Sequence, residues 1–200
     1  FSRTSASVDR VLEMLDEPID DITFEMRTRS QDFNIIGPIE FNDVSFEYEA
    51  NTPILTHINL QINPGEHLAI TGPSGSGKST LISLLPRFNE PTSGKITIGG
   101  HDIADMRMQD VRGMFGFAFQ EAFLFKASIL DNLLYAKPTA SMANIKNACK
   151  LTGAHSFIEK MPEGYNTQIG GQGVELSHGQ KQRINLARAL IRDTQSLVID

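Results

Sequence analysis

A run of eight residues has the types and spacing that hold a chain of phosphate groups. Residues 72–79 fit the P-loop (Walker A) pattern G-x-x-x-x-G-K-[ST] at every fixed position. The apolar run 67–71 precedes them and a helix-like stretch, 79–85, follows, which predicts a strand, a loop and a helix in that order. The glycines let successive backbone N–H groups turn toward one anion, and the helix N-terminus adds partial positive charge. The pattern therefore predicts a nucleoside triphosphate site. Its candidate residues are Gly72, Ser74, Gly75, Ser76, Gly77, Lys78, Ser79 and Thr80.

Three side chains have the chemistry that phosphate transfer needs. We expect Lys78 to reach the β- and γ-phosphates and the Ser79 hydroxyl to ligate Mg²⁺. The apolar run 196–199 reads as a buried strand that leads into Asp200. A carboxylate at the end of a central strand can hold Mg²⁺ through water. Strands often end in Asp, so Asp200 gains its weight from the loop upstream. We expect Lys78 and Asp200 to be catalytic, and Ser79 and Asp200 to be metal ligands.

Composition limits the classes of protein to which the chain can belong. Its 200 residues are 40% hydrophobic and 21% charged, which is typical of a globular domain with a sizeable core. A net charge of −6 argues against a surface built for nucleic acid, so we expect no nucleic-acid partner. The single cysteine, Cys149, excludes an internal disulfide, and we expect its thiol to be buried. The histidines lack zinc-site spacing, and no apolar run is long enough to span a membrane, so we expect the segment itself to be soluble and cytosolic.

The order of the predicted elements indicates an α/β fold. Residues 1–16 read as a short amphipathic helix and 17–38 as a polar stretch, so we expect a linker over 1–38 and a compact domain over 39–200. Alternating strands and helices favour a P-loop NTPase core with a parallel sheet, and the hairpin-like region 39–62 predicts an antiparallel β subdomain beside it. The predicted strands cover 39–48, 58–62, 67–71, 95–98, 114–119 and 196–199, and the predicted helices cover 79–85, 129–135, 142–151, 157–161 and 180–192.

A second motif points to a family. Residues 176–180 read LSHGQ and resemble the LSGGQ signature of ATP-binding-cassette (ABC) proteins. Ser177 and the N–H groups around Gly179 stand at the start of the predicted helix 180–192, where a γ-phosphate can bind. An ordinary Ser-capped helix is the alternative. The resemblance covers essentially the whole chain. It implies an α-helical subdomain that carries the signature, and a head-to-tail dimer in which each ATP lies between one molecule's P-loop and the other's signature. The implied nucleotide-binding residues on the signature side are Ser177, Gly179 and Gln180.

Other positions match the same family. Tyr48 stands where ABC proteins stack an aromatic ring on adenine, with a core or surface aromatic as the alternative. Gln120, after the predicted strand 114–119, stands where the family has a glutamine that contacts Mg²⁺ and the attacking water. The resemblance makes Gln120 a catalytic and metal-binding candidate, on a loop that meets a membrane domain. Residues 164–167 are similar to the exporter segment that contacts the partner half's coupling helix, and residues 5–18 to the linker that follows an exporter's last membrane helix.

The chain departs from the family pattern at several positions. His178 replaces the usual signature glycine, but Ser177 and Gly179 are intact, so we expect the γ-phosphate contact to survive in weakened form. Gln168 and Gln172 stand where a glutamate and an arginine are common, so we expect altered coupling between domains. Asp200 is the last residue, whereas the family usually continues with a glutamate that polarises the attacking water. Losing a general base typically costs about 10²–10⁴-fold in rate. We therefore expect a fragment, truncated at the Walker B aspartate, that binds nucleotide better than it hydrolyses it.

Three functions fit these observations. The first is the nucleotide-binding domain of an ATP-driven membrane exporter, an ATPase that uses ATP and Mg²⁺. Its expected partners are a second nucleotide-binding domain, identical or different, and the transmembrane domain of the same transporter, and its expected place is the cytoplasmic face of the plasma membrane. The second is the binding-only half of a heterodimeric exporter, with His178 as one sign. The third is a soluble ABC ATPase, against which the linker-like residues 1–18 and the acidic composition count.

Overall fold

A computed structural model describes residues 37–171 and 173–200. The predicted N-terminal helix and residues 17–36 of the predicted linker lie outside the described residues, so the assignment of 1–38 stays a prediction. The first strand, β1 (Ile39–Glu47), begins where the sequence predicts the compact domain to start. Of the helices in the described part of the chain, none combines the length and the apolar character that a membrane crossing requires.

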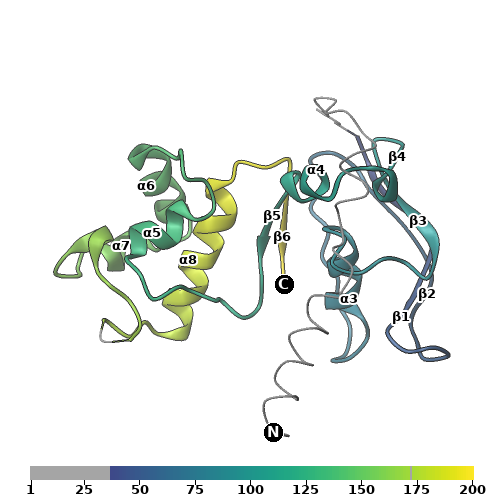
Figure 1. Ribbon diagram of the computed structural model, residues 1–200, viewed down its shortest axis with the longest axis horizontal. Helices are drawn as coiled ribbons and strands as arrows, with labels where there is room; N and C mark the ends of the chain where they lie inside the picture. The colour runs from purple at the N-terminus through teal and green to yellow at the C-terminus, as the bar shows by residue number, and fades with distance from the viewer. Residues whose placement is uncertain (1–36, 172) are drawn as a thin grey trace, which may run out of the picture. The chain divides into compact units, whose positions relative to one another are not determined.

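Four strands form an antiparallel sheet in the order β2-β1-β3-β4 (Figure 1). The bounds of the other three strands are Pro53–Ile62 for β2, Ser93–Ile98 for β3 and His101–Asp102 for β4. Phe41, Val44 and Phe46 on β1 are buried, and the register of β1 against β2 shifts between them. Such shifts are β-bulges, which keep these apolar side chains on the covered face. The predicted hairpin over 39–62 is confirmed, with β2 beginning at Pro53 rather than at residue 58.

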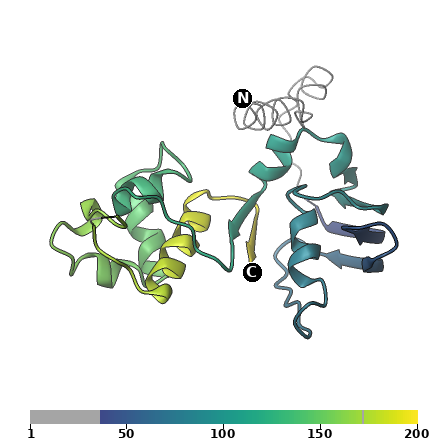
Figure 2. The ribbon, with the colours of Figure 1, turned by 60° about the horizontal axis from the view of Figure 1, so that its bottom comes forward.

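Helix α3 (Lys78–Leu84) begins inside the predicted P-loop and lies beside β2 (Figures 1 and 2). The helix is confirmed, but the predicted strand before the loop is wrong. Residues 67–71 have no strand assignment, and Leu68 and Ile70 are exposed. A strand needs a neighbour for its backbone N–H and C=O groups. An apolar run signals a tendency toward burial and does not say where that neighbour lies.

A parallel pair of strands, β5 (Phe115–Ala118) and β6 (Ser196–Ile199), forms the second sheet. Both predicted strands and their parallel arrangement are confirmed. Helix α4 (Met108–Gly113), which no pattern in the sequence predicted, leads into β5. Gly116 of β5 lies against the backbone of Ala189, since a Cβ there would stand 2.7 Å from the Ala189 carbonyl oxygen. Only glycine allows so close an approach without a shift of the backbone.

Four further helices pack around one apolar cluster (Figure 1). Their bounds are Ile129–Leu134 for α5, Met142–Leu151 for α6, His155–Ile158 for α7 and His178–Ile191 for α8. Two short 3-10 helices, η1 (Ile103–Asp105) and η2 (Gly164–Asn166), lie in the connections. Helix α6 has its predicted bounds. Helices α5 and α8 each end one residue before their predicted ends, α8 begins two residues before its predicted start, and α7 differs from the predicted 157–161. Cys149 is buried in this cluster, as predicted.

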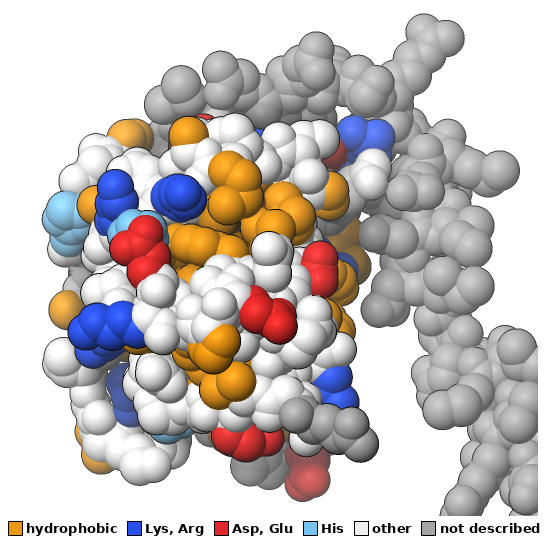
Figure 3. All heavy atoms as spheres, turned by 90° about the vertical axis from the view of Figure 1, so that its left-hand side faces the viewer, with side chains coloured by type: hydrophobic (Ala, Val, Ile, Leu, Met, Phe, Trp, Pro, Cys, Tyr) orange, Lys and Arg blue, Asp and Glu red, His pale blue; other side chains and the backbone are white. Residues whose placement is uncertain are grey.

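This helical group is the predicted α-helical subdomain, since α8 starts within the signature-like residues. Fully buried isoleucines at positions 129, 145 and 184 join α5, α6 and α8. On the outer face, hydrophobic side chains lie between charged side chains of both signs (Figure 3). The fold is thus mixed α/β, with an antiparallel sheet, a parallel pair and a helical subdomain, as the sequence predicts.

Candidate functional site

The P-loop turns into α3 through glycines with positive φ. The φ angle is 80° at Gly75 and 86° at Gly77, a region that glycine enters without steric strain. A Cβ on Gly77 would stand 2.9 Å from Cδ2 of Leu55, so the loop packs too closely for a side chain there. Gly77 is the N-cap of α3, and no side chain in the described chain caps this helix. The first N–H groups of α3 are therefore left for another acceptor.

The Lys78 side chain folds back over the loop. Its Nζ donates hydrogen bonds to the carbonyl oxygens of Gly72 and Pro73, at 3.1 and 2.8 Å. The ammonium group is thereby held at the beginning of the loop, although Lys78 itself belongs to the first turn of α3. A positive charge and uncapped N–H groups on one loop favour an anion with several oxygens, such as a phosphate chain.

Ser79 and Asp200 meet although they are 121 residues apart in sequence. The Ser79 Oγ donates a hydrogen bond to Oδ1 of Asp200 at 3.1 Å, and both residues are exposed. The backbone N–H of Asp200 donates to the Ala118 carbonyl oxygen at 3.0 Å and so continues the β5–β6 pairing. A hydroxyl and a carboxylate oxygen are the ligand types that Mg²⁺ prefers. The donor set at this contact fits Mg²⁺.

Gln120 lies at the same edge of the parallel pair as Asp200. It comes two residues after the end of β5, and parallel strands share one carboxyl edge. Asn185 of α8 fixes this turn, because its Nδ2 donates to the carbonyl oxygen of Phe119 at 2.9 Å. Gln120 is exposed and, in the chain as described, forms no hydrogen bond with Ser79 or Asp200. The structure thus brings Gln120 to the edge of the site without joining it to the pair.

Tyr48 follows β1 and reaches the first turn of α3. Its hydroxyl lies 3.3 Å from Oγ1 of Thr80, and its ring packs edge-on against Phe46, with ring centres 4.8 Å apart. Tyr48 remains 61% exposed. A flat base can stack on such an open ring. Two of the predicted nucleotide-binding residues, Tyr48 and Thr80, are therefore neighbours.

Ser177 is the N-cap of α8, and Gln180 completes a capping box. The Ser177 Oγ accepts a hydrogen bond from the Gln180 N–H at 3.3 Å, and Oε1 of Gln180 accepts one from the Ser177 N–H at 2.9 Å. An ordinary Ser-capped helix has the same bonds. Ser177, His178 and Gly179 are exposed, and a Cβ on Gly179 would have no heavy atom within 4 Å. The start of α8 is thus open on the side of Gly179.

The predicted site residues fall into two groups. The P-loop, Tyr48 and Asp200 form the first, with Gln120 at its edge, and the start of α8 forms the second. Among the residues that the structure describes, no hydrogen bond joins Ser177, Gly179 or Gln180 to the first group. Within one chain, the two groups are separate surfaces.

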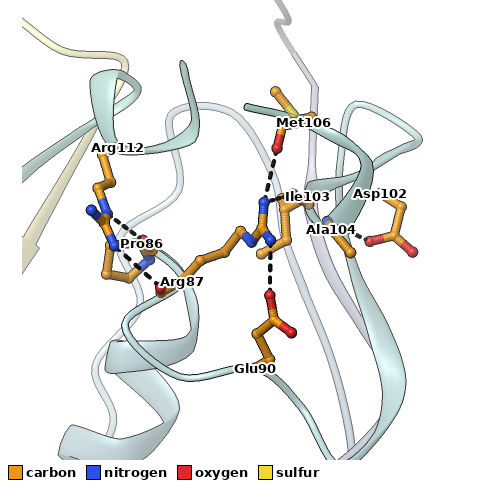
Figure 4. A network of polar contacts seen from close by, with 8 residues as sticks. All are labelled: Pro86, Arg87, Glu90, Asp102, Ile103, Ala104, Met106 and Arg112. Atoms are coloured by element: carbon orange, nitrogen blue, oxygen red, sulfur yellow. Dashed lines mark hydrogen bonds and ion pairs between the residues drawn. The ribbon is translucent and has the colours of Figure 1, made fainter. Parts of the chain in front are cut away.

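Sequence reasoning missed two sets of polar residues, one beside Gln120 and one at the end of α3 away from Ser79. Asn185 is buried on the apolar side of α8, and a polar residue in an apolar stripe is a signal that could have revealed it. Arg112 donates to backbone carbonyl groups just after α3, and Arg87 donates to those of Ile103 and Met106, in and after η1 (Figure 4). No sequence pattern marks a guanidinium whose acceptors belong to the backbone of other elements.

Comparison with known proteins extends these observations. The family model described as ABC transporter matches residues 55–200. The chain is 42% identical over 201 residues to "Putative multidrug export ATP-binding/permease protein YgaD" of Bacillus subtilis (strain 168), covering 100% of this chain and 34% of that protein. It is 39% identical over 202 residues to "ABC transporter B family member 19" of Arabidopsis thaliana, covering 100% of this chain and 16% of that protein.

A solved structure of a bacterial Atm1-family ABC exporter with ATP bound matches the fold with a TM-score of 0.87 at 32% sequence identity. The match covers 100% of this chain and 34% of that one, so the chain spans about a third, or less, of the length of these relatives. The family match covers most of the chain, and the Bacillus subtilis relative is named an ATP-binding/permease protein. The chain belongs to the ABC transporter family, as the ATP-binding domain of an exporter-type protein.

Proposed function

We propose that this domain binds Mg-ATP at the P-loop and couples ATP binding and hydrolysis to export. The observation that carries the proposal is the 3.1 Å hydrogen bond between Ser79 and Asp200, which joins the P-loop helix to the edge of the parallel pair. In this proposal the backbone N–H groups of residues 72–80 and the Lys78 ammonium bind the phosphates. Tyr48 stacks on adenine.

Ser79 and Asp200 are the residues that would hold Mg²⁺, with Gln120 as a third oxygen donor. Bound Mg²⁺ supplies charge neutralisation at the β- and γ-phosphates. The chain's own residues do the positioning: Lys78 orients the phosphate chain, and Gln120 and Asp200 orient the attacking water. Because Gln120 lies on an exposed turn held by Asn185, its side chain is free to approach a bound nucleotide. Lys78, Gln120 and Asp200 are thus our catalytic assignments.

The start of α8 is proposed as a second phosphate site that acts on a partner's nucleotide. Ser177 and Gly179 are exposed and, among the residues that the structure describes, make no hydrogen bond to the P-loop of their own chain. A γ-phosphate bound by Gly179 and Gln180 therefore belongs to another molecule. This favours a head-to-tail pair with a second nucleotide-binding domain, either a copy of this one or a related chain.

Coupling to export requires a membrane domain as the other partner. Phe123 and Tyr135 are 70% and 66% exposed, and the guanidinium of Arg188 lies 5.6 Å from the centre of the Tyr135 ring. Exposed aromatic side chains of this kind are typical of a surface that another protein covers. We propose that residues 1–38 connect the domain, residues 39–200, to this membrane partner at the cytoplasmic face of a membrane, with the plasma membrane as the expected one.

A binding-only role in a heterodimer is the second candidate function. The observation that favours it is His178, which stands in the open turn between Ser177 and Gly179, where the signature usually has glycine. An imidazole there narrows the approach of a γ-phosphate to the start of α8. Single-turnover hydrolysis by the intact protein distinguishes the two, since a binding-only domain retains ATP unhydrolysed.

The experiment that tests ATP binding is a titration of the intact protein with a fluorescent ATP analogue. Lys78→Ala should weaken binding at least about a hundredfold, because it removes the only charged group on the loop and two hydrogen bonds within it. Lys146→Ala, on the exposed side of α6, is the matched control and should bind as the wild type does. Unchanged affinity in Lys78→Ala would contradict the P-loop assignment.

A further inference from the structure

Two arginines tie the end of α8 to the end of α3. Arg192 follows α8 as its C-cap, and its Nη2 donates to the carbonyl oxygen of Arg112, in the last turn of α4, at 3.2 Å. Arg112 in turn donates from Nε to the carbonyl oxygen of Pro86 at 3.0 Å and from Nη2 to that of Arg87 at 3.4 Å. Pro86 and Arg87 come directly after α3 (Figure 4). The bonds thus run from α8 through α4 to α3.

Arg87 extends the same chain of bonds to η1. Its Nη1 donates to the carbonyl oxygens of Ile103 and Met106, at 3.3 and 2.8 Å, and its Nη2 pairs with Glu90 at 2.8 Å (Figure 4). The Arg87 side chain is only 12% exposed, so these acceptors replace water around a buried charge. Arg87, Arg112 and Arg192 therefore each donate to backbone carbonyl groups of a segment other than the one to which they belong.

The acceptors explain why arginine occupies these positions. Arg192 donates to a carbonyl group in the last turn of α4, and such groups have no partner within the helix and carry partial negative charge. The acceptors of Arg112 lie just beyond Leu85, the C-cap of α3. Arg112 lies in the last turn of α4, and its planar fork reaches two carbonyl groups at once. A lysine ammonium lacks that geometry. The Arg112 guanidinium also lies 5.3 Å from the centre of the Phe88 ring, which fixes the plane of the fork.

The other ends of α3 and β6 meet at the proposed Mg-ATP site. Ser79 in the first turn of α3 bonds to Asp200 after β6, and β6 follows α8 through residues 193–195. The end of α8 is seated on β5 at Gly116, where the Ala189 backbone approaches closely. Helix α3 is therefore held at both ends relative to β6: at its start by the Ser79 bond, and at its end by the arginines.

We propose that Arg112 and Arg192 are positioning residues for the nucleotide site, which set the spacing between Ser79 and Asp200 from the far end of α3. The inference rests on the proposed function, because that spacing matters only if the pair holds Mg²⁺ with a nucleotide. Seven residues at 1.5 Å each make α3 about 10 Å long, so a small tilt at Pro86 is carried to Ser79. Loss of either arginine should loosen the Ser79–Asp200 contact while leaving the phosphate loop formed.

The test compares nucleotide binding to the intact protein with and without Mg²⁺, using a fluorescent ATP analogue in excess Mg²⁺ and in EDTA. Arg112→Lys keeps the charge but loses the fork, and Arg192→Met keeps the length but loses the donor. Each should change the Kd in EDTA by less than about twofold and reduce the Mg²⁺-dependent tightening about fivefold, as loss of one or two hydrogen bonds predicts. The double variant should lose no more of the Mg²⁺-dependent tightening than the more affected single variant, because Arg192 reaches the end of α3 only through Arg112.

Arg107→Lys is the matched control on the same helix. Arg107, the N-cap residue of α4, pairs with Asp110 in the first turn at 2.6 and 2.8 Å, and neither residue belongs to the bonds that link α8 to α3, so Arg107→Lys should lower the unfolding midpoint without changing the Mg²⁺ effect. If Arg112→Lys and Arg192→Met also lower only the midpoint, the arginines merely stabilise the fold and the inference is overturned. Effects that multiply in the double variant overturn it as well. Failure of the wild-type protein to bind the analogue overturns the proposed function itself, a result distinct from an unchanged Mg²⁺ effect in the variants.

Discussion

The Ser79 hydroxyl donates a 3.1 Å hydrogen bond to the carboxylate of Asp200, across 121 residues of sequence. This contact connects the first turn of α3 with the carboxyl edge of the β5–β6 pair. The Asp200 N–H donates to the Ala118 carbonyl oxygen, so the β5–β6 pairing fixes the backbone that carries the carboxylate. A functional group on a strand is positioned more accurately than one on a free loop. The fold therefore fixes the geometry of the proposed metal–nucleotide site.

Replacement of Tyr48 should weaken ATP binding through loss of base stacking. Tyr48→Ala removes an open aromatic surface, and stacking is typically worth ~1–3 kcal/mol, so the Kd for ATP should rise about tenfold or more. Tyr48→Phe keeps the ring and loses only the contact with Thr80, so it should stay within about threefold of wild type. Isothermal titration of the intact protein measures both.

Inorganic tripolyphosphate provides the control for this prediction. It carries the phosphate chain without a base, so the Tyr48→Ala variant should bind it as the wild type does. Equal loss of affinity for ATP and for tripolyphosphate would show that Tyr48 shapes the P-loop rather than contacts adenine.

A comparison of two N-cap serines distinguishes a structural role of Ser177 from a role in the dimer. Ser177 caps α8 and Ser141 caps α6, each by accepting a backbone N–H bond from three residues further on. Changing either to alanine should cost about 1 kcal/mol of stability. Only Ser177→Ala should reduce ATP-driven closure of the dimer, measured by crosslinking, and it should leave nucleotide affinity of the separate domain unchanged. If both variants close normally, or both fail alike, the second phosphate site is wrong.

The buried Cys149 and Tyr165 predict a loss of stability at alkaline pH. Burial raises the pKa of the Cys149 thiol above its ordinary 9.0, and a hydrogen bond with Tyr165 partly opposes the rise. Burial, with a smaller contribution from Cys149, also raises the pKa of the Tyr165 hydroxyl. Both groups therefore ionise more readily in the unfolded chain. Their contribution to stability is complete below the unfolded pKa values and is lost as pH rises above them.

Urea unfolding at a series of pH values checks this prediction. The free energy of unfolding should fall between about pH 8 and pH 11, and less steeply in Cys149→Ala, which has lost one of the two groups. The variant's overall stability should be lower at neutral pH because it leaves a small cavity. A slope that is the same in both proteins would mean that the thiol ionises equally in the folded and unfolded states.

Local patterns predicted the parts of the site that local chemistry determines. The P-loop spacing, the strands β5 and β6 and the bounds of α6 depend on residues close in sequence, and each was found. The sequence predicts that Ser79 and Asp200 lie together, because a P-loop hydroxyl and an aspartate at the end of a strand can hold the same Mg²⁺. The strand at 67–71 was wrong for the opposite reason, since pairing depends on a neighbour that an apolar run does not specify.

The arginine contacts show a second limit of sequence reasoning. The acceptors of Arg112 and Arg192 are backbone carbonyl groups 25 to 80 residues away, and a carbonyl group leaves no mark in a sequence. Gly116 is similar: its lack of a side chain matters only because the backbone of Ala189 comes against it. Short elements such as α4, with six residues, also carry too little periodicity to be predicted.

The most direct test of the proposed site is a double-mutant cycle on Ser79 and Asp200, read as the ratio of nucleotide Kd in EDTA to that in Mg²⁺. We predict that Ser79→Ala and Asp200→Asn each reduce this ratio about tenfold, or ~1.4 kcal/mol, with affinity in EDTA nearly unchanged. The double variant should lower this ratio no further than the more affected single variant does, because both residues act on one ion. Independent, multiplying effects, or a ratio that neither variant alters, would contradict a shared Mg-ATP site at this contact.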